Sequence, residues 1–437
     1  MPPERLSIEE FLSARRMHFA AIDAGKCCDD FLAEMTRGLN GEPSSLVMIP
    51  TYIETAQEVP RGQPVIALDA GGTNLRVAAV TFDQSGKAVV EDLARHRMPG
   101  IDEEIGKEEF FRTLAEYVMP LAGRSDRIGF CFSYPAEMLP DKDGKLINFT
   151  KEVKARGVDG QLIGKNLSQA LERAGARRPP KVVLLNDTAA TLLAGRNAIP
   201  GHSFDDFIGI VCGTGFNASY VEGNRNIRKL AGLDQSGSQV VNTESGSFAL
   251  SPSGAIDDMY DATTATPSRY RHEKMISGAY LGHLGLIAMQ QAAAAGCFSP
   301  GAVRALGSVN ELSTRDFNNF LLHPDSADNP LGAVSVGLPA DDRRDMVSLL
   351  DALVERASVL VAITISAVIL KTGKGRDPEV PVCVTVDGTT YWELASFDKR
   401  VQSHLGRLLT GERQRAWEIT AGRDAPLLGA AIAALTN

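Results

Sequence analysis

Two glycine-rich turns are the first feature of the sequence with a chemical use. Asp69-Ala-Gly-Gly-Thr-Asn74 and Gly213-Thr-Gly215 each lie between two short runs of β-type residues. Glycine lets the backbone bend sharply and turn several N–H groups outward, and such a group of donors binds anions, above all phosphate. A single Gly/Asn turn is also the usual signal of a plain β-hairpin. One such turn alone therefore leaves both interpretations open.

The second turn also matches a pattern with a different meaning. Gly213-Thr-Gly-Phe-Asn-Ala218 fits the dinucleotide-binding motif G-x-G-x-x-G/A. That motif needs a helix to start at the turn, whereas residues 218–222 continue as a β-type run. Neither turn has the G-K-[ST] of a P-loop. With a third turn at Asp387-Gly388-Thr389, the pattern predicts a nucleotide clamped between two domains.

Asn186-Asp187 is the strongest candidate for acid–base chemistry. The pair follows the apolar run 182–185 and precedes a helical pattern that starts at Thr188. Asp is a preferred helix N-cap, which would be a purely structural role. Ligands of α/β domains bind at the carboxyl ends of strands, where a carboxylate could be the general base for a hydroxyl. The local pattern leaves both roles open.

Other polar residues also follow β-type runs. Taken singly, each fits an exposed loop. Together they provide amides, hydroxyls, one carboxylate and one ammonium group, which is a set of donors and acceptors suited to a ligand rich in hydroxyls. They are Ser133, Thr150, Lys151, Asn217, Asn242 and Glu244.

The elements that position these residues alternate between strand and helix. Such alternation predicts an α/β protein with two sheets. Residues 65–82 and 207–222 both read as strand, glycine turn and strand, which suggests two similar domains. The predicted strands are 65–68, 75–82, 127–132, 181–185, 207–212, 240–241 and 381–386; the predicted helices are 108–121, 163–174, 188–196, 273–294 and 346–370, with further helices before residue 60.

Composition excludes several classes of function. The chain has 437 residues, with 45 Lys and Arg against 54 Asp and Glu, a net charge of −9. This balance disfavours a nucleic-acid groove or a membrane-surface patch. The apolar run 357–370 is shorter than the roughly 20 residues that cross a bilayer, so it predicts a core helix. Six cysteines without C-x-x-C spacing, and an N-terminus without an apolar run, predict a cytoplasmic protein.

The motifs, in their order along the chain, resemble the hexokinase family of ATP-dependent sugar kinases, within the actin-like two-domain ATPases. The resemblance implies two actin-like (ribonuclease H-like) domains, each a mixed sheet flanked by helices, with a cleft between them. It places residues 61–195 plus 423–437 in a small domain and 1–60 plus 196–422 in a large one. The matching segments are 38–52, 68–77, 130–135, 149–151, 186–188, 213–218, 242–244, 273–282 and 386–389.

The resemblance also implies a reaction and its residues. A hexose would be phosphorylated at its 6-hydroxyl by ATP with Mg²⁺, and Asp187 would be the general base. The first expected substrate is glucose, and mannose and fructose are the alternatives. A non-catalytic sugar sensor of the same fold is the alternative. The sequence leaves the oligomeric state open, and whether Arg76 touches phosphate. The implied sugar ligands are Ser133, Thr150, Lys151, Asn186, Asn217, Glu244 and Glu273; Asp69 would position Mg²⁺; Gly71, Gly72, Thr73, Asn74, Gly213, Thr214 and Gly215 would hold phosphates, and Asp387, Gly388 and Thr389 would lie near the nucleoside.

The sequence departs from the family pattern in five places. Phe149 and Ser245 stand where the family usually has Trp, and Glu152 replaces a glycine. The stretch from Tyr260 to Glu273 is several residues shorter than usual, which leaves the shape of one sugar-binding loop open. Ala421-Gly-Arg-Asp-Ala425 replaces Ser-Gly-Lys-Gly-Ala, which leaves the nucleotide-base preference open.

Overall fold

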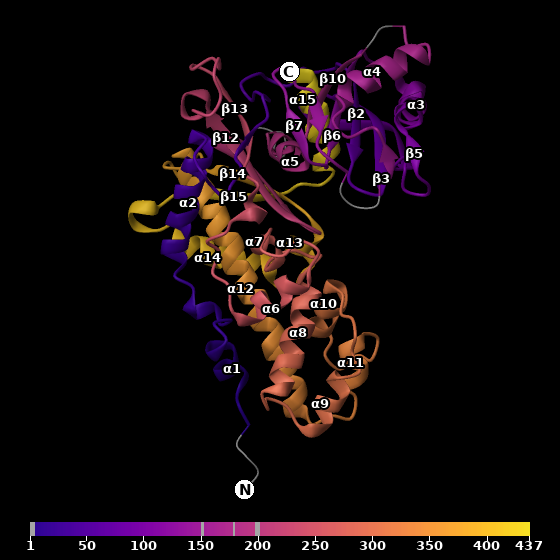
Figure 1. The fold of residues 1–437 in the computed structure, drawn as a ribbon. Helices are drawn as coiled ribbons and strands as arrows, with labels where there is room; N and C mark the ends of the chain where they lie inside the picture. Colours follow the sequence, from indigo (N-terminus) through magenta and orange to yellow (C-terminus); the bar gives the residue numbers. More distant parts are fainter. Residues whose placement is uncertain (1–4, 150–152, 178–179, 197–201) are drawn as a thin grey trace.

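The structure is a computed structural model, and it describes residues 5–149, 153–177, 180–196 and 202–437. It contains two mixed sheets. We call the five-stranded sheet with its helices the small lobe and the six-stranded sheet with its helices the large lobe (Figure 1).

The small lobe is built on a sheet in the order β10-β6-β2-β3-β4. Strands β2 and β3 form an antiparallel hairpin around the first glycine turn, while β6 and β10 run parallel to β2. Every residue of β2 is buried, as expected for a strand that is covered on both faces. The strands are β2 (Val65–Ala70), β3 (Asn74–Phe82), β4 (Ala88–Arg97), β6 (Arg127–Phe132) and β10 (Lys181–Leu185).

Alternate residues of β2 pack on different helices. Ile66 and Leu68 belong to a core with α3 (Lys107–Val118) and α4 (Ile163–Arg173). Val65 and Ala67 belong to a second core with α5 (Asp187–Gly195) and α15 (Ala425–Thr436). The period-two alternation of a strand thus assigns one face to each helix pair.

Two glycines allow α15 to lie close to its neighbours. A Cβ at Gly129 of β6 would lie 1.8 Å from the backbone oxygen of Ala430, and a Cβ at Gly429 would lie 1.9 Å from that of Ala190. The C-terminal helix is therefore wedged between β6 and α5, although it follows a strand of the other sheet.

The large lobe repeats the small one. Its sheet has the order β1-β13-β12-β11-β14-β15, in which β11 and β12 form the antiparallel hairpin around the second turn. Strands β14 and β15 run parallel to β11, as β6 and β10 do to β2. This arrangement confirms the predicted duplication. The strands are β1 (Ile49–Pro50), β11 (Asp206–Cys212), β12 (Phe216–Gly223), β13 (Ser238–Asn242), β14 (Val382–Asp387) and β15 (Trp417–Ala421).

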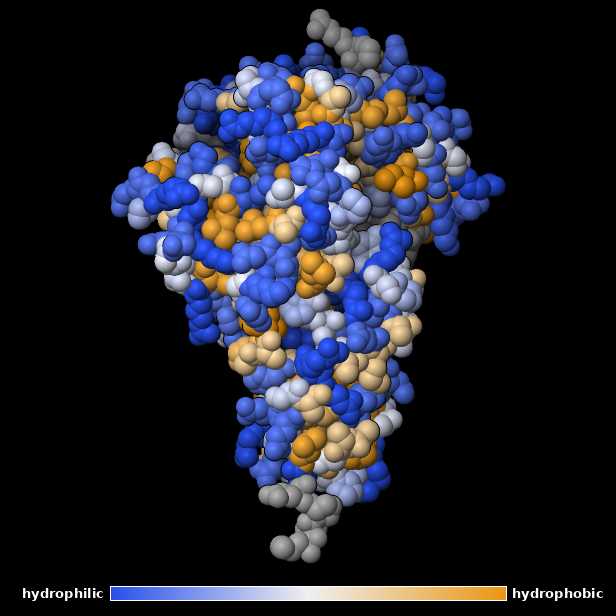
Figure 2. All heavy atoms as spheres, turned by 60° about the vertical axis from the view of Figure 1, so that its left-hand side comes forward, coloured by the Kyte–Doolittle hydropathy of each residue, from blue (hydrophilic) through white to orange (hydrophobic). Residues whose placement is uncertain are grey.

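The central helix of the large lobe is α12 (Ala340–Thr372), which extends further at both ends than the predicted 346–370. By length and composition it could cross a membrane, but 89% of its most apolar window is buried inside the protein. It is a core helix, as predicted. On the face in Figure 2, hydrophobic residues lie among hydrophilic ones, and scattered surface hydrophobic residues are common in folded proteins.

The other helices of the large lobe surround α12 or extend beyond it (Figure 1). They are α1 (Ile8–Ala14), α2 (Ala24–Asn40), α6 (Ala255–Thr263), α7 (Arg271–Lys274), α8 (Leu281–Ala294), α9 (Pro300–Leu306), α10 (Thr314–Leu322), α11 (Pro330–Ser335), α13 (Thr389–Glu393) and α14 (Phe397–Leu408). Short strand pairs complete the small lobe: β5 (Ile105–Gly106) with β9 (Ala155–Arg156), and β7 (Ala136–Met138) with β8 (Gly144–Leu146).

The predicted single helix over 273–294 is interrupted at residues 275–280. Helix α7 ends at Lys274 and α8 begins at Leu281. Between them, the N–H of Gly278 donates to the backbone oxygen of Gly213 at 2.7 Å, and the N–H of Ala279 donates to that of Thr214 at 3.1 Å. Because these N–H groups bind the second glycine turn, they do not continue the helical hydrogen bonding.

Candidate functional site

The first glycine turn joins β2 to β3, and two hydrogen bonds fix its backbone. The N–H of Gly71 donates to the backbone oxygen of Asn74 at 3.2 Å, and the hydroxyl of Tyr134 donates to that of Gly72 at 2.6 Å. A Cβ at Gly71 would meet no atom within 4 Å. Thr73 and Asn74 are exposed. The turn therefore has a fixed backbone with open space at Gly71.

The second and third glycine turns contact one another. Thr390, just after the third turn, donates its hydroxyl to the backbone oxygen of Gly213 at 2.8 Å. Gly388 has a φ of 119°, which favours glycine, and a Cβ there would lie 2.3 Å from the backbone oxygen of Cys212. Thr214 and Thr389 are both exposed beside this contact. The two turns thus form one surface at the ends of β11 and β14.

Asn186, and not Asp187, caps helix α5. The Asn186 side chain accepts a hydrogen bond from the N–H of Ala189 at 3.0 Å. Asp187 is the first helical residue, and its Oδ1 accepts from the N–H of Thr188 at 2.8 Å. Helix α5 also reaches the large lobe, because the Ser219 hydroxyl on β12 donates to the backbone oxygen of Thr188 at 2.8 Å. Asp187 therefore lies where the two lobes meet.

Polar side chains of the large lobe gather beside β12. The Asn217 side-chain amide donates to Asn242 Oδ1 at 2.7 Å and to Glu244 Oε1 at 3.2 Å. The Asn242 amide donates to the same Glu244 oxygen at 2.7 Å. Glu273 Oε2 accepts from the N–H of Phe216 at 2.8 Å. The structure thus brings together three of the predicted sugar ligands and adds Asn242, which the sequence placed only at a strand end.

The carboxylates of this cluster interact with Asp187. Burial raises the pKa of Glu244, and the negative charge of Asp187 raises it further. Burial, followed by the charges of Glu244 and Asp187, raises the pKa of Glu273 to about 6, against a hydrogen bond from Phe216. These interactions place Asp187 within electrostatic range of the large-lobe cluster.

A second group of carboxylates lies at the glycine turns. Burial raises the pKa of Asp387 to about 6, and the charges of Asp187 and Asp69 contribute to the rise. Asp69 belongs to the small lobe and Asp387 to the large one. Asp187 therefore interacts both with the polar cluster beside β12 and with the carboxylates at two turns.

Arg76 is paired within the protein. Its Nε donates to Asp69 Oδ2 at 2.9 Å, and its Nη1 donates to Asp424 Oδ1 at 2.6 Å. Asp424 has a φ of 53° and stands where the family pattern has glycine, which adopts this conformation more readily. Arg76 therefore links the aspartate of the first turn to the segment that leads into α15.

The carboxylates near the turns suit a magnesium ion that keeps most of its waters better than a metal ion that is bound by protein side chains alone. In the part of the chain that the structure describes, no group of three or more His, Cys, Asp or Glu side chains could hold a metal by itself. Mg²⁺ usually keeps several waters and binds one or two carboxylates together with substrate phosphates. Asp69, only 7% exposed at the end of β2, fits such a site beside the first turn.

Of the remaining predicted ligands, the structure describes Ser133, which directly follows β6. The N–H of Ser133 donates to the backbone oxygen of Ala70 at 3.1 Å, which fixes Ser133 beside β2. Phe149 packs its ring against that of Tyr134 with centroids 5.1 Å apart, so the residue that replaces Trp is part of the aromatic core. Thr150 and Lys151 lie outside the described residues.

Comparison with known proteins agrees with this arrangement. Two hexokinase family models match residues 8–197 and 207–436. Hexokinase-5 of Oryza sativa is 30% identical over 441 residues, which cover 94% of this chain and 85% of that protein. Human hexokinase-3 is 30% identical over 408 residues; the match covers 89% of this chain and 42% of that longer protein.

Solved structures agree on the fold. A hexokinase from Schistosoma mansoni complexed with glucose superposes with a TM-score of 0.78 at 24% identity, and the match covers 98% of this chain and 99% of that one. A likeness at this identity establishes the fold, whereas the family rests on the sequence matches. The chain belongs to the hexokinase family.

Proposed function

We propose that this protein transfers the γ-phosphoryl group of ATP to the 6-hydroxyl of a hexose, with glucose as the preferred substrate. The observation that carries the proposal is the position of Asp187. Its charge acts on Glu244 and Glu273 and, together with that of Asp69, on Asp387. One carboxylate thus interacts both with a polar cluster suited to hydroxyls and with a carboxylate at the turns suited to phosphates.

The sugar would be held mainly by the large-lobe cluster. Asn217 and Asn242 offer amide groups, while Glu244 and Glu273 offer carboxylate oxygens that accept from sugar hydroxyls. Ser133, Asn186, Thr150 and Lys151 would complete the site from the small lobe, as the family resemblance implies. Asp187 would accept the proton of the 6-hydroxyl as the oxygen attacks phosphorus.

The donor would be held by the three glycine turns. Backbone N–H groups at residues 71–74 and 213–215, with the Thr214 hydroxyl, would bind phosphate oxygens. Asp69 would hold a hydrated Mg²⁺, which neutralises the charge that develops on the phosphate oxygens. Asp387, Gly388 and Thr389 would lie near the nucleoside. Closure of the two lobes around both substrates would exclude water as a competing acceptor.

A coupled assay for ADP tests the proposal. Purified protein receives MgATP with glucose, mannose, fructose or N-acetylglucosamine in turn, and ADP formation is followed with and without sugar. We expect ADP release that depends on sugar, is fastest with glucose, and is accompanied by a 6-phosphate product. Glucose binding without ADP release for any sugar would favour the sensor alternative. The cytoplasmic location stays a prediction that the assay does not address.

The pH dependence of sugar affinity should follow the carboxylates of the sugar cluster. Protonated Glu273 donates where the ionised form accepts, so hexose affinity should fall as the pH drops through about 6. For one such ionisation, we expect the glucose KM at pH 5 to be about tenfold higher than at pH 7. Glu273→Gln should have a high KM that changes little over this range.

A loss of folding stability does not account for the expected fall in glucose affinity at low pH. Because the folded-state pKa of Glu273 lies above its ordinary value of 4.5, protonation of Glu273 favours the folded state. Its contribution to stability is fully present below about pH 4.5 and is lost as the pH rises through about 6. Thermal unfolding measured at each pH separates the two effects. A glucose KM that is flat between pH 5 and 7 would contradict a role for ionised Glu273.

A further inference from the structure

The link between α6 and α7 is short and sharply bent. It comprises residues 264–270, within the stretch that is shorter than the family pattern. Ser268 and Tyr270 have φ values of 65° and 54°, a region that non-glycine residues seldom adopt. Such backbone persists only when surrounding contacts fix it. Contacts with the rest of the protein, and not the backbone preferences of its own residues, therefore fix the segment that leads into Glu273.

The contacts that fix the link converge on Lys274. This side chain is 3% exposed, and its ammonium group donates to Asp261 Oδ1 at 2.6 Å, Thr264 Oγ1 at 2.7 Å and the backbone oxygen of Thr266 at 2.7 Å. All three donors of the ammonium are thus used. The other oxygen of Asp261 accepts from the N–H of Ser268 at 2.7 Å. One buried ion pair therefore binds the link at three places.

The residue on the other side of Glu273 is equally fixed. His272 is fully buried between the hydroxyls of Ser251, 2.7 Å from Nδ1, and Thr364, 3.0 Å from Nε2. Burial lowers its pKa to about 3, so it is a neutral anchor at ordinary pH. Glu273 thus lies between two anchored neighbours while its own carboxylate reaches the N–H of Phe216.

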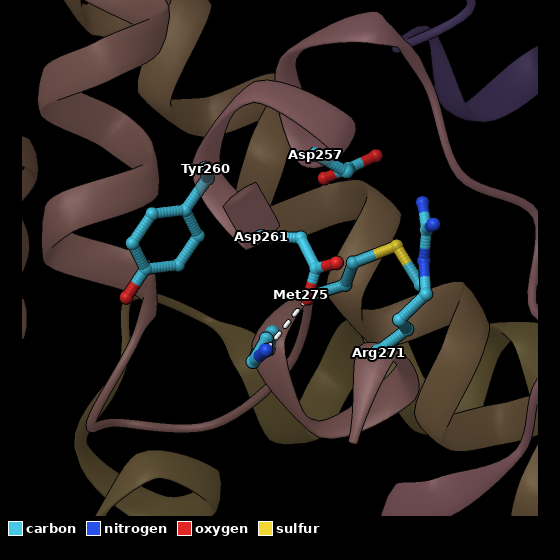
Figure 3. Close-up of a pocket in the computed structure, with 6 residues that line it drawn as sticks. Asp257, Tyr260, Asp261, Arg271 and Met275 are labelled. Carbon is cyan, nitrogen blue, oxygen red and sulfur yellow. Dashed lines mark hydrogen bonds and ion pairs between the residues drawn. The ribbon is translucent and has the colours of Figure 1, made fainter. Parts of the chain in front are cut away.

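We propose that Lys274 is a positioning residue for the sugar: it fixes the α6–α7 link so that the Glu273 carboxylate is set beside the second glycine turn before substrate binds. This inference rests on the proposed function. Lys274 acts through Glu273, because its ammonium group is taken up by the link and the cavity that it lines, of about 10 Å³, has room for about one water molecule and none for a sugar. The other residues that line this cavity are Asp257, Tyr260, Asp261, Arg271 and Met275 (Figure 3).

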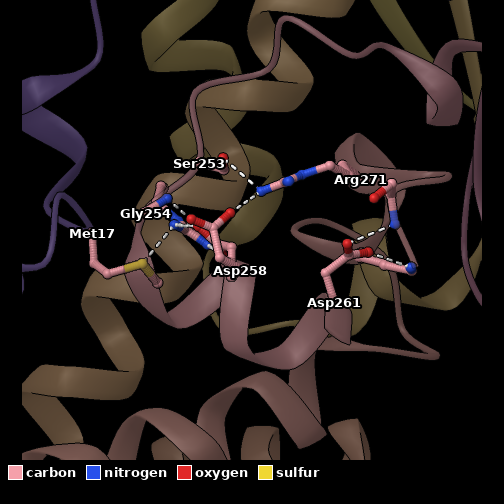
Figure 4. A network of polar contacts seen from close by, with 10 residues as sticks. Met17, Ser253, Gly254, Asp258, Asp261 and Arg271 are labelled. Atoms are coloured by element: carbon pink, nitrogen blue, oxygen red, sulfur yellow. Dashed lines mark hydrogen bonds and ion pairs between the residues drawn. The ribbon is translucent and has the colours of Figure 1, made fainter. Parts of the chain in front are cut away.

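A second buried ion pair on α6 provides a matched control. Arg356 is 1% exposed and donates two hydrogen bonds to Asp257, at 2.7 and 2.6 Å, one helical turn before Asp261. It also contacts Met17 Sδ at 3.2 Å. Met17 lies beside Gly254 at the start of α6, whereas the link follows the end of that helix (Figure 4). Arg356 therefore resembles Lys274 in burial and in its partner helix but does not bind residues 264–270.

The test compares Lys274→Met with Arg356→Met. Both variants leave a buried aspartate of α6 without its cation, so both should lower the melting temperature. We expect Lys274→Met to raise the glucose KM at least tenfold with an ATP KM within twofold of the parent value. Arg356→Met should leave both KM values within twofold. Equal changes in glucose KM for the two variants would overturn the proposal, because the effect would then be general destabilisation.

A milder variant covers the case in which Lys274→Met does not fold. Thr264→Val removes one acceptor of Lys274 at nearly constant volume, and we expect a two- to threefold rise in glucose KM. An unchanged KM in Thr264→Val, when Lys274→Met does not fold, would also overturn the proposal. Glucose binding measured by calorimetry repeats the comparison without turnover, so the inference stays testable if the parent protein forms no sugar phosphate.

The pH profile adds a readout that a purely structural role would not move. The groups that face Glu273 are Glu244 and Asp187, which raise its pKa, and Lys274, which lowers it. Removing the ammonium charge should therefore shift the acid limb of the glucose KM to higher pH in Lys274→Met. In Arg356→Met the acid limb should stay where it is in the parent protein.

Discussion

Asp187→Asn should lose nearly all hexose-dependent turnover and still bind glucose with an affinity within a few-fold of the parent protein. A general base contributes about 10²- to 10⁴-fold to a rate, so kcat should fall by a factor in this range. The amide oxygen of Asn can keep the hydrogen bond that Asp187 accepts from the N–H of Thr188, so the start of α5 should be unchanged. Steady-state kinetics and glucose calorimetry measure the two quantities.

The neighbouring Asn186 supplies the control for Asp187→Asn. Asn186→Ala removes the helix cap at Ala189, which should cost about 1 kcal/mol of stability. Its kcat should fall much less than that of Asp187→Asn, because the base remains. Near-normal turnover in Asp187→Asn would remove Asp187 from the base role, and loss of glucose binding would indicate a structural role instead.

Asp187→Asn should also change the ionisation of its neighbours. The charge of Asp187 raises the pKa values of Glu244 and Glu273. Without that charge both pKa values should fall, so the acid limb of glucose binding should move to lower pH. Calorimetry of the variant between pH 5 and 7 measures this shift, and an unmoved limb would contradict the placement of Asp187 beside the cluster.

Gly71→Ala should weaken ATP binding without destabilising the protein. A Cβ at this position meets no atom within 4 Å, so the fold should accept it. The methyl group would stand where the proposed phosphate approaches the backbone N–H groups of the first turn. We expect the ATP KM to rise at least tenfold, with the glucose affinity and the melting temperature close to those of the parent protein.

Gly388→Ala is the counterpart in which stability should also fall. Its Cβ would lie 2.3 Å from the backbone oxygen of Cys212, at a φ of 119° that alanine adopts only with strain. Gly388→Ala should lower the melting temperature as well as the ATP affinity.

For Gly71→Ala, a normal ATP KM in a fully folded protein would show that the first turn does not hold the donor.

The sequence predicted the two hairpins well because a hairpin is determined by neighbouring residues, which are those of the turn and of its two flanking strands. The turns at 71–74 and 213–215 need glycine and small polar residues, and the flanking strands are short runs rich in apolar residues. Strand β4 gave no such signal, since it is an edge strand whose residues are mostly exposed. The break at 275–280 was missed because it depends on hydrogen bonds to residues more than 60 positions earlier in the chain.

The candidate site also combines residues that a local pattern reveals with residues that only the fold brings together. Asn186 and Asp187 could be found from a strand end followed by a helix start, although the pattern could not assign the cap to one of them. Glu273 was placed by the family resemblance and not by any local pattern. The Arg76 link to Asp424 joins residues 348 positions apart, and the Asn242 contacts cross from β13 to β12, so only the fold brings these groups together.

A crystal structure with glucose, Mg²⁺ and a non-hydrolysable ATP analogue tests the role of Asp187 most directly. We predict that the 6-hydroxyl oxygen lies within about 2.6–3.2 Å of the Asp187 carboxylate, with the γ-phosphate on its opposite side, between residues 71–74 and 213–215. A sugar whose 6-hydroxyl lies away from Asp187, or a triphosphate bound away from both glycine turns, would contradict the account.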